Sequence, residues 1–204
     1  MDKVLSDRLI FWMVIIFITI FFANIIYIKN IGRPVHNINV EELQNYFPNR
    51  TMNKMFKNES KNETFTHLVD FVKDGKVQIK QIDKLAKVVM VYSLDNDAIR
   101  LVYTKNLDSK NIGIDYTQDL VANRNDIIIM SPIQEGTRWW DDDGGLYEII
   151  NKDAVVETPA GRFQTLVVKY INDDFTVKEY YAEDIGLVKI VVNNFDTFEL
   201  VNYR

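Results

Sequence analysis

The chain contains no cysteine and only two histidines among its 204 residues. Without cysteine there is no disulfide, no thiolate ligand for zinc and no N-terminal cysteine to carry a lipid. His36 lies in a polar segment and His67 in a strand pattern, so neither has a second histidine at metal-ligand spacing. We therefore expect neither a metal site nor a cofactor.

Sequence motifs for catalysis are missing as well. The chain has no G-x-S-x-G, no P-loop and no G-x-G-x-x-G. A serine hydrolase arrangement would have to pair His67 with a scattered serine such as Ser93 or Ser131. We expect no catalytic residues and a protein that is not an enzyme, with His67 on the exposed face of its strand. The net charge of -5 gives no electrostatic reason to bind nucleic acid.

Charged residues are absent from residues 9–28 (LIFWMVIIFITIFFANIIYI), a length of helix that spans about 30 Å of hydrocarbon. A cleaved secretory signal is the alternative, but its apolar core is shorter and ends in small residues, whereas Ala23 alone is small here. We predict an uncleaved transmembrane helix whose partner is the lipid bilayer. The arm before it is short, so we expect the long C-terminal part outside the cytoplasm, although basic residues are nearly balanced across the span.

These features divide the chain into four parts. Residues 1–8 form a short cytoplasmic arm and residues 9–28 the single membrane span. Residues 29–45 are a polar linker that we expect to close with a short helix near its end. Residues 46–204 have the length of one domain with its own core, and we predict an extracytoplasmic β domain at the cell membrane.

Within this domain the hydrophobic pattern has a period of two residues. Short segments rich in β-branched and aromatic residues alternate with Gly, Asn and Asp turns, which predicts strands joined by tight connections. Such connections join antiparallel neighbours, so we predict a mainly β fold, a curved meander of about nine to eleven strands forming a half-barrel or barrel. The expected strands are residues 65–72, 76–82, 88–94, 99–105, 126–133, 146–157, 163–171, 175–182, 187–195 and 197–203. One long loop, residues 106–125, interrupts this rhythm.

The densest polar cluster follows two adjacent tryptophans, Trp139 and Trp140. Neighbouring strand residues face opposite sides, so at most one of the two lines a given face while the other packs in the core. The carboxylates of residues 141–143 could bind Ca²⁺, but the order of an EF-hand loop is absent. We interpret this cluster as a solvated hairpin connection.

The C-terminal half resembles a family of extracytoplasmic β domains of unknown function from Gram-positive spore-forming bacteria, which occur on lipoproteins or behind a signal segment. The matching elements are Gly136 with Trp139, the TPAGRF run of residues 158–163, YYA at 180–182, IGLVK at 185–189, and YFP at 46–48 as the opening. The chain is also similar, by fold analogy, to the curved sheets of lipoprotein carriers. The resemblance implies no catalytic residues. Gly161 and Gly186 have a structural explanation, since turns of this kind need positive φ.

Two functions remain open from the sequence. The first is a membrane-anchored, non-enzymatic binding or assembly module of the cell envelope that recruits an envelope protein. The second is a carrier or sensor that holds an apolar ligand in the concave face of the sheet, under the long loop. A cavity lined by Tyr, Phe, Ile and Val would favour the second. The candidate surface for a ligand or partner consists of Trp139, Trp140, Tyr180, Tyr181 and Tyr116.

Overall fold

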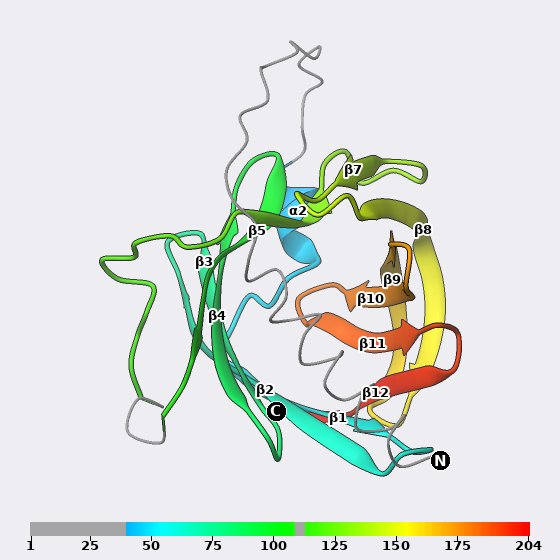
Figure 1. Ribbon diagram of the computed structural model, residues 1–204, viewed down its shortest axis with the longest axis horizontal. Helices are drawn as coiled ribbons and strands as arrows, with labels where there is room; N and C mark the ends of the chain where they lie inside the picture. The colour runs from blue at the N-terminus through cyan, green and yellow to red at the C-terminus, as the bar shows by residue number, and fades with distance from the viewer. Residues whose placement is uncertain (1–39, 109–112) are drawn as a thin grey trace.

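The computed structural model describes residues 40–108 and 113–204, so the predicted membrane span at 9–28 lies outside the described residues. Within the described ranges, no helix is both long enough and apolar enough to cross a bilayer. One short helix and one large sheet make up the regular structure of these residues (Figure 1). The helix, α2, is Val40–Asn45, where the sequence predicts it.

The sheet has twelve strands. They are β1 (Met52–Asn58), β2 (Glu63–Lys73), β3 (Lys76–Ile82), β4 (Lys87–Leu94), β5 (Ala98–Asn106), β6 (Asp126–Met130), β7 (Arg138–Trp140), β8 (Leu146–Thr158), β9 (Gly161–Ile171), β10 (Thr176–Ala182), β11 (Gly186–Val192) and β12 (Asp196–Tyr203). Every neighbouring pair is antiparallel, in the order β6-β5-β4-β3-β2-β1-β12-β11-β10-β9-β8-β7. The first and last strands therefore pair in the middle of the sheet, and β6 and β7, which are consecutive in the chain, form its two edges.

The sheet curls until these edges approach each other, which gives a nearly closed barrel (Figure 1). A side chain joins them: the indole Nε1 of Trp139 on β7 donates to the carbonyl oxygen of Ile127 on β6, at 3.0 Å. Trp139 is 4% exposed and its ring stacks on that of Tyr147, with centroids 5.3 Å apart. The two edge strands are thus linked by the Trp139 side chain, although they are not paired through backbone hydrogen bonds.

The two ends of the barrel differ. At the end where the chain enters, α2 and the following residues 46–48 cover the interior, and we call this the plugged end. The N–H of Asp184 donates to Asn45 O at 2.7 Å, and the ring of Phe47 lies 4.9 Å from that of Tyr92. Pro48 packs so closely on Gly186 that a Cβ there would lie 2.8 Å from its Cδ. The turns after β1, β3, β7, β9 and β11 surround the opposite end, which we call the open end.

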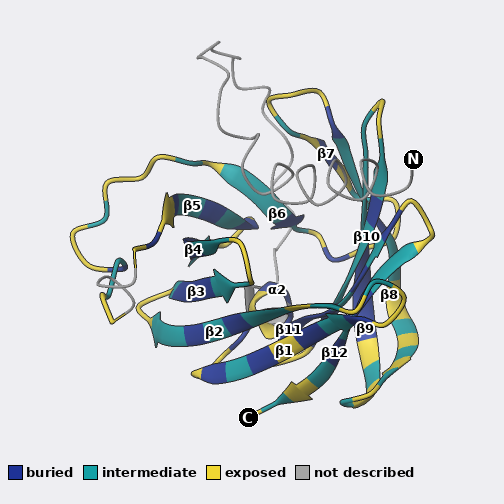
Figure 2. Cartoon of the chain, turned by 60° about the horizontal axis from the view of Figure 1, so that its bottom comes forward, coloured by how far each residue is buried: buried dark blue, intermediate teal, exposed yellow. Residues whose placement is uncertain are grey.

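The predicted mainly β fold and antiparallel sheet are confirmed, with two strands more than the ten that the sequence indicates. The predicted meander is interrupted once, because β6 and β7 follow each other in the chain but are not paired. β1 was missed because Lys and Asn interrupt its apolar residues, and β7 because it has only three residues. The burial pattern of β1 is nonetheless regular, because buried residues alternate with more exposed ones along the strand (Figure 2). Gly161 and Gly186 have φ of 141° and 73°, the positive values expected for their turns.

Residues 114–116 of the long loop lie against the outer face of the sheet, so the expectation that the loop covers the concave face is wrong for its described part. Gln78 and Lys80 point outward from β3, since they alternate with residues that line the interior. Tyr116 N–H donates to Gln78 Oε1 at 2.7 Å, and Gln78 Nε2 donates to the carbonyl oxygen of Ile114 at 3.0 Å. Lys80 forms an ion pair with Asp70 beneath the same loop. These buried polar groups hold the loop against the outside of the barrel.

Candidate functional site: a cavity inside the barrel

The described residues surround a cavity of about 900 Å³ in the interior of the barrel. Its wall combines side chains from strands on all sides of the sheet, and aromatic and aliphatic residues provide much of it. Among them are Phe47, Phe65, Tyr92, Tyr147, Ile190 and Phe198. Ligand sites in proteins typically have volumes of about 300 to 1,000 Å³ and mostly apolar walls. The cavity therefore has the size and lining of a site for a small apolar molecule.

The polar residues of the cavity are unevenly distributed along its axis. Phe47 and Leu187 line it at the plugged end, where Lys54 Nζ also lies. Turns at the open end add several carboxylates, those of Asp83, Asp141, Asp143 and Asp174, together with Lys61 and Lys84. A molecule that enters from the open end thus passes a charged rim before it reaches the aromatic interior.

A ladder of aromatic rings extends along the wall from β7 to the turn after β9. Tyr147 stacks on Trp139, Tyr170 lies 4.6 Å from Tyr147, and Phe175 lies 5.6 Å from Tyr170, measured between ring centroids. The turn after β7 makes room for this ladder: a Cβ on Gly145 would lie 2.3 Å from the Tyr170 ring. Glycine is therefore required there by close packing.

The carboxylate of Asp141 shapes the same turn. Its Oδ1 accepts hydrogen bonds from the backbone N–H of Asp143, at 3.1 Å, and of Gly145, at 2.6 Å. These bonds make the acidic cluster a hairpin connection, as the sequence indicates. Among the described residues, no group of three or more His, Cys, Asp or Glu is arranged to hold a metal ion.

A row of polar side chains crosses the inner face of β1, β2 and β3. Lys54 pairs across the strands with His67, and His67 with Gln81, and all three line the cavity. His67 is 4% exposed, so the expectation that it lies on an exposed face is wrong. The expectation failed because Phe65, His67 and Val69 share the face that the barrel encloses.

The protonation of His67 follows from its partners. Its Nε2 lies 3.0 Å from Gln81 Oε1, and because that oxygen only accepts, Nε2 carries the proton. Burial, with the nearby Lys54, lowers the pKa of His67 to about 3, which leaves the ring neutral. Lys54 Nζ donates to the carbonyl oxygens of Ile185 and Leu187, each at 3.0 Å, and burial lowers the pKa of Lys54 to about 7.

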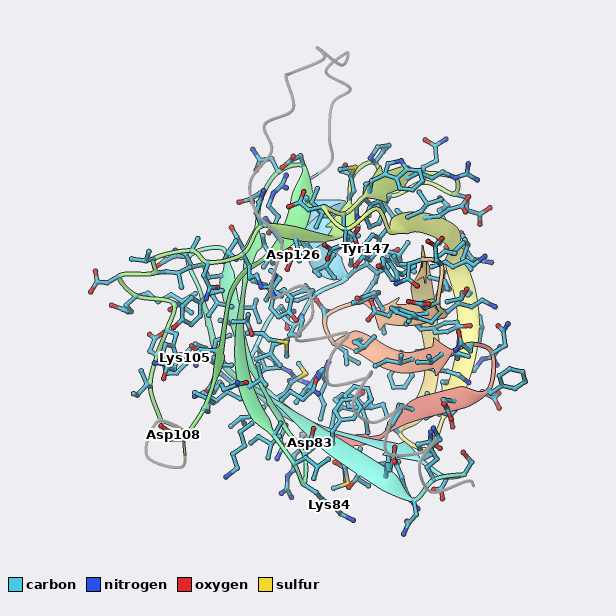
Figure 3. All side chains as sticks on the ribbon, in the orientation of Figure 1. Asp83, Lys84, Lys105, Asp108, Asp126 and Tyr147 are labelled. Atoms are coloured by element: carbon cyan, nitrogen blue, oxygen red, sulfur yellow. The ribbon has the colours of Figure 1, made fainter. Side chains whose placement is uncertain are left out.

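A second polar group lies on the opposite wall. Glu179 of β10 faces the cavity, and its Oε2 accepts a hydrogen bond from Tyr181 Oη at 2.6 Å. Burial raises the pKa of Glu179, and the bond from Tyr181 opposes this rise. Burial also raises the pKa of Asp126 on β6 to about 6, against the opposing charge of Arg124. Figure 3 shows Asp126 and Tyr147 close together in the view, and the charge of Asp126 contributes to the raised pKa of Tyr147.

The five residues proposed from the sequence as a ligand or partner surface do not form one surface. Tyr181 lines the cavity, Trp139 bridges the two edge strands, and Tyr180 pairs with Val167 and Lys189 without lining the cavity. Trp140 is 67% exposed, so the two tryptophans do face opposite sides, as expected. Tyr116 lies in the long loop on the outer face, stacked on Tyr103.

Three polar residues that line the interior, Lys54, His67 and Glu179, were not predicted to lie there from the sequence. A signal for each was present, because each stands between apolar residues two positions away. Lys54 lies between Met52 and Phe56, and Glu179 between Val177 and Tyr181. A charged residue on an otherwise apolar strand face is a candidate for function, since burying an unpaired charge is costly.

Comparison with known proteins assigns no family to the chain. No family model matches the chain, and no curated protein matches it either. A solved structure from Bacteroides fragilis, described as a "putative exported protein with YmcC-like fold", has 15% identity and a TM-score of 0.46, over 78% of this chain and 98% of its own. A second, a "putative lipoprotein" from Parabacteroides distasonis, has 14% identity and a TM-score of 0.45, over the same shares. Neither description states a ligand or an activity.

Proposed function

We propose that this protein is a membrane-tethered carrier or sensor that holds a small apolar molecule inside its β barrel. The observation that supports this most strongly is the cavity of about 900 Å³, lined by aromatic and aliphatic side chains and open at one end. A domain of this size normally fills its interior, because interiors are packed as densely as organic crystals. The interior that the described residues leave open therefore supports the binding of a ligand there.

Burial of apolar surface in the cavity supplies weak affinity by itself. Transfer of a buried methylene group from water is worth about 0.8 kcal/mol, so a ligand with ten such carbons gains roughly 8 kcal/mol before the cost of association. That cost is estimated at about 4 kcal/mol or more. The difference of about 4 kcal/mol corresponds to a dissociation constant of about 1 mM for an apolar chain alone, and polar contacts in the cavity would strengthen the binding.

The cellular setting is part of the proposal. Residues 9–28 would anchor the chain, and the barrel would lie outside the cytoplasm. Residues 29–39 join the two, and eleven residues reach at most about 40 Å, which keeps the barrel close to the membrane surface. A carrier in that position is suited to molecules that move between a membrane and the surrounding envelope.

A binding role without catalysis agrees with the state of His67. A general base works best with a pKa near the operating pH, whereas the pKa of His67 is about 3 and its Nε2 is occupied by Gln81. We therefore include the absence of enzymatic activity in the proposal.

The proposal is tested by filling the cavity. Val177 lines the interior, so Val177→Phe places a ring where the ligand would lie, whereas Val155→Phe makes the same change at an exposed position on β8. Titration with the fluorescent apolar probe N-phenyl-1-naphthylamine should show binding by the parent and by Val155→Phe, and at least about tenfold weaker binding by Val177→Phe. Equal binding by all three proteins would contradict an interior site.

A second candidate, the binding or assembly module, is favoured by one observation. Leu85, Trp140 and Phe195 are 75%, 67% and 83% exposed, and all three lie at the open end. Exposed apolar residues gathered at one end are typical of contact surfaces. If this end recruits an envelope protein, Trp140→Ser and Phe195→Ser should abolish a specific crosslink in intact cells while probe binding in the cavity stays unchanged.

A further inference from the structure

Glu179 is a carboxyl group inside the barrel, and it has no cationic partner among residues 40–108 and 113–204. Its neighbours across the strands are Val168 on β9 and Ile190 on β11, both apolar. Its hydrogen bond comes from Tyr181, and no lysine or arginine of the described residues forms an ion pair with it. The Glu179 side chain is half-buried, and burial raises its pKa, so an ionised carboxylate there has lost part of its water without gaining a counter-charge from the described residues.

Three tyrosine side chains line the same cavity as this carboxyl group. Tyr181 lies on the same strand, Tyr147 comes from β8, and Tyr92 comes from β4 on the facing wall. Burial raises the pKa of each of these phenols, and the charge of Glu179 raises it further, which shows that all three lie within its electrostatic reach. Asp126 also acts on Tyr92 and Tyr147 and adds a second negative charge nearby.

We infer that Glu179 and the tyrosines Tyr92, Tyr147 and Tyr181 form a subsite for the ammonium group of an amphipathic ligand, whose apolar part fills the rest of the barrel. The phenol oxygens of the three tyrosines lie within electrostatic reach of Glu179 and can accept hydrogen bonds from an ammonium group. An ammonium group also supplies the missing counter-charge of Glu179 through a charge-assisted hydrogen bond. This inference rests on the proposed carrier function and specifies its ligand class.

Other head groups fit the subsite less well. A carboxylate would be repelled by Glu179 and Asp126, and a hydroxyl group would gain a hydrogen bond but no attraction between opposite charges. Lys54 does not take the place of the missing cation, because its Nζ is held by the carbonyl oxygens of Ile185 and Leu187 at the plugged end. The wall around Glu179 therefore selects for positive charge although the cavity as a whole contains one buried lysine.

The test compares three water-soluble molecules with one apolar body and different head groups: 4-phenylbutylamine, 4-phenylbutanol and 4-phenylbutyrate. Calorimetric titration uses the full chain in lipid nanodiscs, with the heats of empty nanodiscs subtracted. We expect the amine to bind about tenfold more tightly than the alcohol, and the carboxylate to bind weakest. Glu179→Gln should reduce the preference for the amine to less than about threefold, with alcohol binding unchanged. Glu157→Gln, the same change at an exposed position, should keep the full preference.

The outcomes separate this inference from the function on which it rests. Equal affinities for the amine and the alcohol, or an unchanged preference in Glu179→Gln, would overturn the ammonium subsite and leave the carrier function standing. Binding of none of the three molecules would overturn both. If Glu179→Gln does not fold, the order of the three affinities for the parent chain decides alone, since it requires no substitution.

Discussion

The packing of Pro48 on Gly186 holds the plugged end of the barrel, and its strength can be measured by replacing Gly186 with alanine. Gly186 has φ of 73°, where a side chain costs about 1 to 2 kcal/mol. The new Cβ would also lie 2.8 Å from Pro48 Cδ, and overpacking of this kind costs about 1 to 3 kcal/mol more. We expect Gly186→Ala to lower the free energy of unfolding by about 2 to 5 kcal/mol.

Gly75 provides a matched control. Its φ of 70° is nearly the same, but the atom nearest to its added Cβ is 3.7 Å away, which is an ordinary contact. Gly75→Ala should therefore lower the free energy of unfolding only by the cost of a side chain at positive φ, about 1 to 2 kcal/mol. Urea unfolding of residues 40–204, followed by tryptophan fluorescence, measures both variants, and Pro48→Ala combined with Gly186→Ala should recover part of the difference. If Gly186→Ala is no more harmful than Gly75→Ala, the plug does not pack on β11 as described.

Three further predictions concern the fold. A protein that begins at residue 40 should be soluble and unfold cooperatively, because the core lies within the described residues; aggregation on expression would contradict this. Trp139→Phe should cost about 1 to 3 kcal/mol in urea unfolding, since the carbonyl oxygen of Ile127 loses its donor, and a smaller effect would mean that the indole bond does not hold the edges together. The free energy of unfolding should rise by about 2 kcal/mol from about pH 7 to 9. In this range Lys54 keeps its proton in the unfolded chain, where its pKa is 10.5, but loses it in the folded protein, where its pKa is about 7. In Lys54→Met this rise should disappear.

The strands and their antiparallel order were accessible from the sequence, because a period of two and short turns leave few alternatives. The direction of each face was harder to predict. In β3, Val77, Ile79 and Gln81 share the inner face, yet Gln78 and Lys80 on the other face are also buried, since the long loop covers them. A strand with both faces buried loses the alternation that identifies the inside.

The candidate site was less accessible for a related reason. Glu179 and the three tyrosines of the proposed subsite come from β4, β8 and β10, which meet only when the sheet closes. Closure itself depends on contacts between the two edge strands, such as the hydrogen bond from Trp139 on β7 to Ile127 on β6. Periodicity predicts each strand by itself and carries no information on which inner residues will face each other across a barrel.

The claim that an apolar ligand lies inside the barrel is tested most directly by contacts between ligand and protein protons. Residues 40–204 with labelled isoleucine methyl groups would be mixed with 4-phenylbutanol, whose neutral head group makes the result independent of the ammonium subsite. Nuclear Overhauser effects should link the phenyl ring to Ile79, Ile128 and Ile190, which line the cavity, and not to Ile114 on the outer face. Contacts confined to Ile114, or the absence of contacts to the three interior residues at saturating ligand, would contradict the account.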